Sequence, residues 1–186
     1  LYENSLIIFT SDNGGLSTLR RVAPTSVYPL RAGKGWLYEG GIKIPQLIKL
    51  PGKTEKEIVN DLTVSYDLFP TILDVAGIIN ENEIDGISLM PRLVEKSKIE
   101  RENIYWHFPH YHGSLWKPGS AIRSGDWKLI FDYESNEAQL FNLKDDPEEL
   151  NNISIIFNEE KERLITELEK MKKETNANSV SINSKI

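Results

Sequence analysis

The apolar positions near the start of the chain predict a buried strand. Residues 6–9, LIIF, are four consecutive apolar side chains with no polar alternation. Such a run is typical of a strand that is covered on both faces, as in a parallel α/β sheet. A second apolar stretch, IKIPQLIKL at residues 42–50, precedes the turn residues Pro51 and Gly52 and predicts another strand.

Three later stretches predict helices. The first begins near Asp67 and ends at Gly77, because glycine is favoured just after the last helical turn. A short helix is predicted at residues 88–93, and a longer one at 158–174 with one apolar face and paired charges on the other. The first helix has apolar residues at spacings of three and four, namely Leu68, Phe69, Ile72, Leu73 and Ala76.

The pattern changes near the charged run EKSKIERE at residues 95–102. Beyond it, short apolar stretches at 104–108, 120–123, 127–132 and 138–143 predict strands, and turn sequences separate the last three. These strands are typical of an antiparallel meander. We therefore expect two domains: residues 1–95 with α/β elements, and residues 96–186 with a small antiparallel sheet and a packed helix.

Asp12 and Asn13 follow the first predicted strand. Parallel sheets bind their ligands beyond the carboxyl ends of the strands, and carboxylate and amide oxygens are ligands that calcium or magnesium prefers. Gly14 and Gly15 allow the backbone to turn sharply after these two residues. The sequence indicates a metal site here, although Asp-Asn-Gly-Gly is also a common turn sequence.

Lys34 lies between two glycines, Gly33 and Gly35. The small neighbours allow a ligand to approach closely, and the ammonium group suits sulfate or phosphate oxygens. The alternative is a solvated lysine in a flexible loop, and no P-loop pattern surrounds it. Nearby arginines could also help to bind an anion, although at least two of them are expected to be solvated or structural, namely Arg20, Arg21 and Arg31.

All three histidines occur in the segment YWHFPHYHGSLW at residues 105–116. A zinc site is disfavoured, because HxxHxH lacks the usual spacing and the chain has no cysteine. We interpret the segment as a sugar-binding rim, in which aromatic faces stack on sugars and imidazoles bind hydroxyl or sulfate oxygens. His110 and His112 are the preferred contacts because they follow Pro109, whereas His107 lies on the predicted strand. The alternative is a loop packed by its aromatic residues.

Composition excludes several classes of function. The formal net charge of −6 argues against non-specific binding to nucleic acid. No run approaches the roughly 20 apolar residues that a membrane-spanning helix requires. The absence of cysteine excludes disulfides and thiolate metal sites. A small-molecule or carbohydrate partner is expected.

Together, SDNGG, LRAGKGWLYEGG and IKIPQLIKLPG resemble, in order and separation, a segment of the sulfatases of the alkaline phosphatase superfamily. SYDLFPTILDVAG, AIRSGDWKLI and QLFNLKDDPEELNN are also similar to sulfatase segments. The resemblance implies the carboxyl-terminal part of an alkaline phosphatase-like α/β sandwich, followed by a small antiparallel sheet with a packed helix. It also implies calcium ligands at Asp12 and Asn13, and a catalytic, sulfate-binding role for Lys34.

The family's nucleophile, a formylglycine made from a C/S-x-P-x-R motif, has no counterpart in this sequence. We therefore expect the carboxyl-terminal portion of a sulfuric ester hydrolase that acts on a sulfated carbohydrate or related ester. This portion would be inactive without the amino-terminal part of the parent enzyme, and the family resemblance implies a periplasmic or secreted location. Two alternatives remain: a phosphate-ester hydrolase of the same superfamily, and a non-catalytic degenerate sulfatase or carbohydrate-binding fragment.

Overall fold

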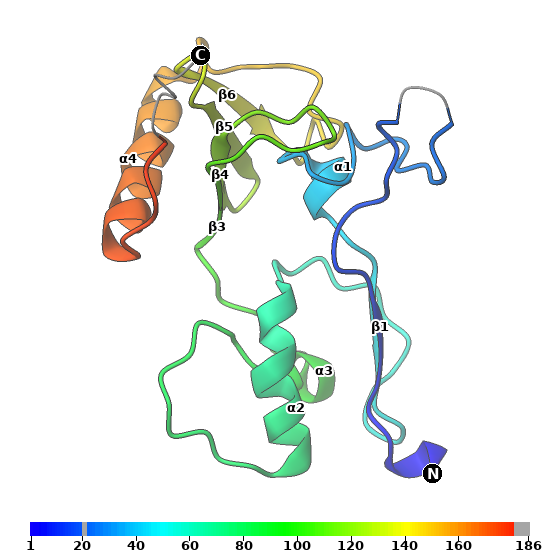
Figure 1. Cartoon of the computed structure of the whole chain (residues 1–186). Coiled ribbons are helices and arrows are strands. Elements are labelled where there is room, and N and C mark those ends of the chain that lie inside the picture. The colour runs from blue at the N-terminus through cyan, green and yellow to red at the C-terminus, as the bar shows by residue number, and fades with distance from the viewer. Residues whose placement is uncertain (20–21, 181–186) are drawn as a thin grey trace. The chain divides into compact units, whose positions relative to one another are not determined.

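The computed structural model describes residues 1–19 and 22–180. The chain folds as two compact units (Figure 1). Unit 1 comprises Leu1–Asp12 and Ile44–Arg101, and unit 2 comprises Asn13–Lys43 and Glu102–Ile186. Residues 13–43 therefore fold with the carboxyl-terminal segment. The predicted domain boundary between residues 95 and 96 stays a prediction.

Unit 1 begins with a short 3₁₀ helix, Tyr2–Asn4, and strand β1, Ile7–Thr10. Strand β1 pairs antiparallel with β2, Gln46–Lys49, so that Ile8 lies opposite Ile48. The expectation of a parallel strand buried on both faces was therefore wrong in the described structure. A lone two-stranded ladder leaves its faces open, and Phe9 is 63% exposed.

The helices of unit 1 lie close to their predicted positions. A 3₁₀ turn, Ser65–Asp67, leads into α2, Leu68–Ala76, which ends at Gly77 in the left-handed conformation, with φ of 68°. The Gly77 N–H binds the carbonyl oxygen of Asp74 at 3.1 Å, as expected for a glycine at the end of a helix. Helix α3, Met90–Glu95, begins two residues later than predicted.

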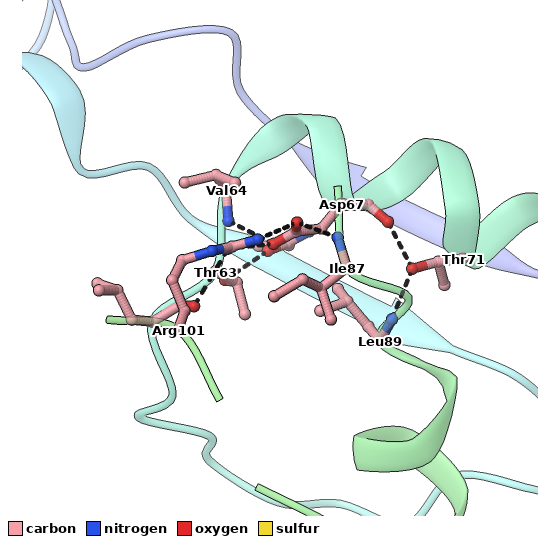
Figure 2. Close-up of polar contacts among 9 residues, drawn as sticks. Thr63, Val64, Asp67, Thr71, Ile87, Leu89 and Arg101 are labelled. Carbon is pink, nitrogen blue, oxygen red and sulfur yellow. Dashed lines mark hydrogen bonds and ion pairs between the residues drawn. The ribbon is translucent and has the colours of Figure 1, made fainter. Parts of the chain in front are cut away.

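Asp67 holds the polypeptide around α2 together (Figure 2). Its fully buried carboxylate accepts hydrogen bonds from the N–H groups of Val64 at 2.8 Å and Ile87 at 2.9 Å. Both terminal nitrogens of Arg101 also bind it, at 2.6 and 2.7 Å. The hydroxyl of Thr71 donates to the Asp67 carbonyl and accepts the N–H of Leu89. This network satisfies the buried charge and ties the loop at 87–89 to the helix.

Unit 2 contains the predicted antiparallel meander. Four strands are hydrogen-bonded in chain order: β3, Asn103–Phe108; β4, Gly119–Ser124; β5, Trp127–Asp132; and β6, Glu137–Asn142. This order confirms the prediction. Helix α4, Asn158–Glu174, has the predicted bounds.

Both faces of this sheet are covered, because side chains alternate across a strand. Ile122 faces α4, and its neighbour Ala121 faces the segment that contains Leu37 and Tyr38. In Figure 1, α4 and the short helix α1, Glu39–Ile42, lie on opposite sides of the sheet. Each fully buried leucine contributes about 1.5–3 kcal/mol to folding. The buried residues of the α4 side are Ile122, Leu129, Leu140, Leu164 and Leu168, and those of the other side include Leu37, Tyr38, Trp116, Ala121, Ile130 and Phe141.

Candidate functional site

Two glycine-rich segments of unit 2 are joined by their backbones, and both carry predicted site residues. The N–H of Gly14 donates to the carbonyl oxygen of Gly41 at 2.9 Å, and the N–H of Lys34 donates to that of Gly15, also at 2.9 Å. Asn13 directly precedes this ladder. The structure therefore brings the Asn13 and Lys34 backbones close together, although the two residues are 21 positions apart in the sequence.

Glycine is required for this approach. A Cβ atom on Gly14 would lie 1.9 Å from the carbonyl oxygen of Gly40, and one on Gly41 would lie 2.1 Å from that of Trp36. A Cβ on Gly33 would meet the Gly15 carbonyl oxygen at 2.5 Å. Because these obstructing atoms belong to the backbone, no side-chain rotation could relieve the clashes. The glycines of SDNGG, GKG and EGG thus permit the packing of the two segments.

Lys34 is exposed at this ladder, so its ammonium is accessible to an anion. Arg31 has a structural role instead: its guanidinium lies 3.9 Å from the centre of the Tyr38 ring and donates to the Glu149 carbonyl oxygen at 2.7 Å. This contact agrees with the expectation that some nearby arginines are structural. Arg20 and Arg21 lie outside the described residues.

His112 lies against the lysine segment. A Cβ atom on Gly35 would be 2.2 Å from His112 Nδ1, and the two segments are tied by the indole N–H of Trp36, which donates to the Ser114 carbonyl oxygen at 3.0 Å. The Ser114 N–H donates to His112 Nδ1 at 3.1 Å. Nδ1 is therefore an acceptor, and in the neutral ring the proton is on Nε2. His112 can present an N–H donor beside the segment that carries Lys34.

The other histidines have different surroundings. His110 is exposed, and the Phe108 ring lies edge-on to both His110 and His112, at centroid distances of 5.7 and 6.1 Å. His107 lies on β3 as predicted, where Nδ1 is 2.7 Å from the Ser120 hydroxyl. A shallow depression beside His110 is lined by Pro109, His110, Tyr111, Pro118, Asn178, Ser179 and Val180.

The predicted metal ligands lie at the point where the chain passes from unit 1 to unit 2. Asp12 is exposed and accepts a 3.5 Å hydrogen bond from the Ser11 hydroxyl, and Asn13 is half-buried. A carboxylate and an amide oxygen fit a hard cation such as calcium, but calcium takes six to eight oxygens, so these two could supply only part of a coordination shell. In the described residues no group of three or more histidine, aspartate or glutamate side chains could hold a metal.

A buried charged cluster next to the glycine ladder was not predicted. Lys128 Nζ lies 2.9 Å from Glu39 Oε1 and 2.7 Å from Glu149 Oε1. Burial raises the pKa of the Glu149 carboxyl, and the charge of Lys128 opposes this shift. One sequence signal could have revealed that Lys128 is buried. Side chains alternate between the two faces of β5, and apolar residues occur on both faces, which indicates that both are covered.

The chain matches the family model described as "N-sulphoglucosamine sulphohydrolase, C-terminal" over residues 32–178. A sulfatase from Formosa agariphila is 35% identical over 164 residues, which cover 81% of this chain and 29% of that protein. Arylsulfatase K of Gallus gallus is 32% identical, with coverage of 86% and 29%. Arylsulfatase A of Homo sapiens is 36% identical, with coverage of 70% and 25%.

Solved structures show the same fold. The crystal structure of Ps i-CgsB has a TM-score of 0.77 and 30% identity, with coverage of 91% of this chain and 37% of that one. BT4656, solved with its substrate D-glucosamine-2-N,6-O-disulfate, has a TM-score of 0.71 and 27% identity, with coverage of 95% and 36%.

These matches define a sulfatase carboxyl-terminal domain, and the chain belongs to the sulfatase family. It spans 25–29% of the length of the three curated relatives named above. The fold class predicted from the sequence, an α/β portion followed by a small antiparallel sheet and a packed helix, is confirmed. None of the helices in the described residues is both long enough and apolar enough to cross a membrane.

Proposed function

We propose that this chain is part of a sulfuric ester hydrolase that removes sulfate from a sulfated carbohydrate or related ester. Two observations support the proposal: the glycine ladder, in which the Lys34 N–H binds the Gly15 carbonyl oxygen near Asn13, and the proximity of His112 Nδ1 to Gly35. An exposed ammonium suits the oxygens of a sulfate ester, and an imidazole N–H suits a sugar hydroxyl beside it. The sulfated glucosamine bound by BT4656 indicates the class of substrate to test first.

Each site residue has a proposed role. Lys34 binds a sulfate oxygen and stabilises the negative charge that develops on the transferring group. Asp12 and Asn13 supply oxygen ligands to calcium, which when bound would polarise the sulfate group. The Nε2–H of His112 donates to a substrate oxygen, and His110 contacts a sugar at the rim.

The nucleophile is proposed to lie outside this sequence, because the chain has no cysteine and no S-x-P-x-R motif. The chain by itself should therefore release no sulfate, whereas the complete enzyme should hydrolyse a sulfated glucosamine. The test is sulfate release by both proteins, with a phosphate monoester as the competing substrate. Turnover by the isolated chain would contradict the missing nucleophile, and preference for the phosphate ester would favour the phosphate-ester alternative. A complete protein that hydrolyses neither ester would favour the non-catalytic alternative.

Substitutions of His112 and His110 test whether these residues bind the carbohydrate. In the complete enzyme, His112→Ala should lower kcat/KM for the sulfated sugar by about 10–100-fold, as expected for the loss of a buried substrate hydrogen bond. It should affect a small aryl sulfate much less. His110→Ala is the matched variant, because His110 is exposed and its effect should be smaller. Equal losses on both substrates would contradict a sugar-binding role for His112.

A further inference from the structure

A cluster of three charged side chains lies inside unit 2, away from solvent. Lys128 and Glu149 are 0% exposed and Glu39 is 3% exposed. Lys128 lies between the two carboxylates, and Arg123 Nη1 is 3.7 Å from Glu39 Oε2. Burying ions is costly, and well-packed apolar side chains often give equal or greater stability. The cluster therefore needs an explanation other than stability alone.

Glu149 holds both ends of the segment that carries Lys34. Its carboxylate accepts the Glu39 N–H at 2.6 Å, and its carbonyl oxygen accepts a hydrogen bond from Arg31 at 2.7 Å. Arg31 precedes Lys34 by three residues, and Glu39 follows it by five. Glu149 also has a φ of 56°, a left-handed conformation that is unfavourable for a residue other than glycine. A strained backbone is thus maintained where the two anchoring contacts converge.

The anchored segment is closed on itself. The Gly40 N–H donates to the Arg31 carbonyl oxygen at 3.0 Å, and the Trp36 N–H donates to that of Gly33, also at 3.0 Å. Lys34 is then linked to Gly15 by the backbone bond of the glycine ladder. A shift of Glu39 would therefore be transmitted to Lys34 through a short chain of backbone hydrogen bonds.

We propose that Lys128 is a positioning residue for Lys34. By pairing with Glu39 and Glu149 at once, it fixes the end of the lysine segment on the face of the sheet, where β5 presents Lys128 and Ile130. Lys128 does not touch substrate and acts through the backbone around Lys34. This inference rests on the proposed function for the role of Lys34, but the geometry that it invokes lies entirely within unit 2.

The test uses the complete enzyme and three variants. Lys128→Met removes the charge but keeps much of the volume, and Lys128→Arg keeps the charge. Leu164→Ala is the control, because Leu164 is fully buried against the opposite face of the sheet. All proteins are compared by thermal unfolding, by kcat and KM, and by hydrogen exchange of the Lys34 amide, at a temperature at which each protein is folded.

Lys128→Met should lower kcat by about 10–100-fold, the scale expected when a reacting group is displaced by about 1 Å. Exchange of the Lys34 amide should become about tenfold faster, because its bond to Gly15 opens more often. Lys128→Arg should recover most of both properties. Leu164→Ala should lose thermal stability while kcat stays within about threefold of the wild type.

When Lys34→Ala is already present, adding Lys128→Met should lower kcat by less than about twofold, because both changes act on the same contact. Equal kcat losses in Lys128→Met and Leu164→Ala would overturn the proposal, as would unchanged exchange at Lys34. If Lys128→Met does not fold, the same comparison is made with Glu149→Gln, and unchanged exchange at Lys34 again overturns the proposal. Wild-type protein without sulfatase activity would refute the proposed function, while hydrogen exchange would still decide the positioning role.

Discussion

Unit 1 and unit 2 each bury charged side chains, but the two clusters differ in what they hold. In unit 1, Asp67 is matched by one cation, Arg101, and by two backbone N–H groups. In unit 2, Glu39 and Glu149 share Lys128, Arg123 lies 3.7 Å from Glu39, and the pKa of Glu149 is raised by burial. The cluster of unit 1 joins parts of a scaffold.

The cluster of unit 2 anchors the segment that carries Lys34. Carboxyl groups with pKa values shifted by burial are frequent near functional sites, since they are retained in spite of their cost. Buried charge in this chain thus has two uses: cohesion of the fold in unit 1, and anchoring of the segment that carries Lys34 in unit 2. Four changes can test this distinction.

The largest loss of stability is expected for Asp67→Ala. The change leaves Arg101, whose side chain is 6% exposed, without its partner and frees two backbone N–H groups. Breaking such a buried pair costs about 3–5 kcal/mol. Urea unfolding measures the loss, with Asp74→Ala on the exposed side of α2 as the control. A loss no greater than that of the control would show that Asp67 does not organise unit 1.

Gly14→Ala should cause the next largest effect. Its Cβ would collide with the Gly40 carbonyl oxygen, so the ladder must move, at a cost of about 1–3 kcal/mol. Gly113→Ala is the matched variant, because a Cβ there meets no atom within 4 Å. In the complete enzyme, Gly14→Ala should lower both the thermal unfolding midpoint and the rate of sulfate release, whereas Gly113→Ala should change neither. Equal behaviour of the two variants would contradict a requirement for close backbone packing.

The charge state of Glu149 predicts a pH dependence of stability. Burial raises the pKa of this carboxyl above 4.5, its ordinary value. At a pH between 4.5 and the raised pKa, the folded protein therefore holds a proton that the unfolded chain has released. The contribution of this group to stability therefore increases as the pH falls from above the folded pKa toward 4.5. Glu149→Gln lacks this titration, although Glu39 and Lys128 still face the position.

Urea unfolding of both proteins between neutral and mildly acidic pH measures the difference. As the pH falls through this range, the free energy of unfolding of the wild type should increase relative to that of Glu149→Gln. Parallel stability curves would show that the Glu149 carboxyl does not titrate differently on folding.

The smallest effect is expected at an exposed ion pair. Lys96 Nζ lies 2.8 Å from Glu55 Oε2, but these side chains are 60% and 76% exposed. Water and salt screen such pairs, so Glu55→Gln should leave the unfolding midpoint unchanged within error. A decrease comparable to that of Asp67→Ala would remove the contrast between buried and exposed charge.

Local patterns predicted much of unit 2. The bounds of β5 and α4 and the order of the meander follow from alternation, turn residues and helical spacing. The pairing of β1 with β2 could not be predicted, because an apolar run does not identify its partner. Helix α1 was also missed, since its four residues include two glycines and no helical pattern can develop over such a length.

The candidate site was predictable only in part. Glycines flanking Lys34 and following Asn13 indicated close approach, and the structure shows the atoms that they accommodate. The proximity of His112 to Gly35 joins chain segments that are 77 positions apart, and no local motif reveals such a contact. The metal ligands, the calcium and an exported location stay predictions. Glu149 carried no local signal, because its partners Glu39 and Arg31 are 110 and 118 residues away.

The central claim is that the backbone of unit 2 presents Lys34 to a sulfate ester. It is tested most directly by kcat/KM of the complete enzyme on a sulfated glucosamine after Lys34→Met, with Lys53→Met, an exposed lysine of unit 1, as the control. Loss of a charge-stabilising contact predicts a decrease of about 10²–10³-fold at unchanged thermal stability. Turnover within about threefold of the wild type, as expected for a surface lysine, would contradict the claim.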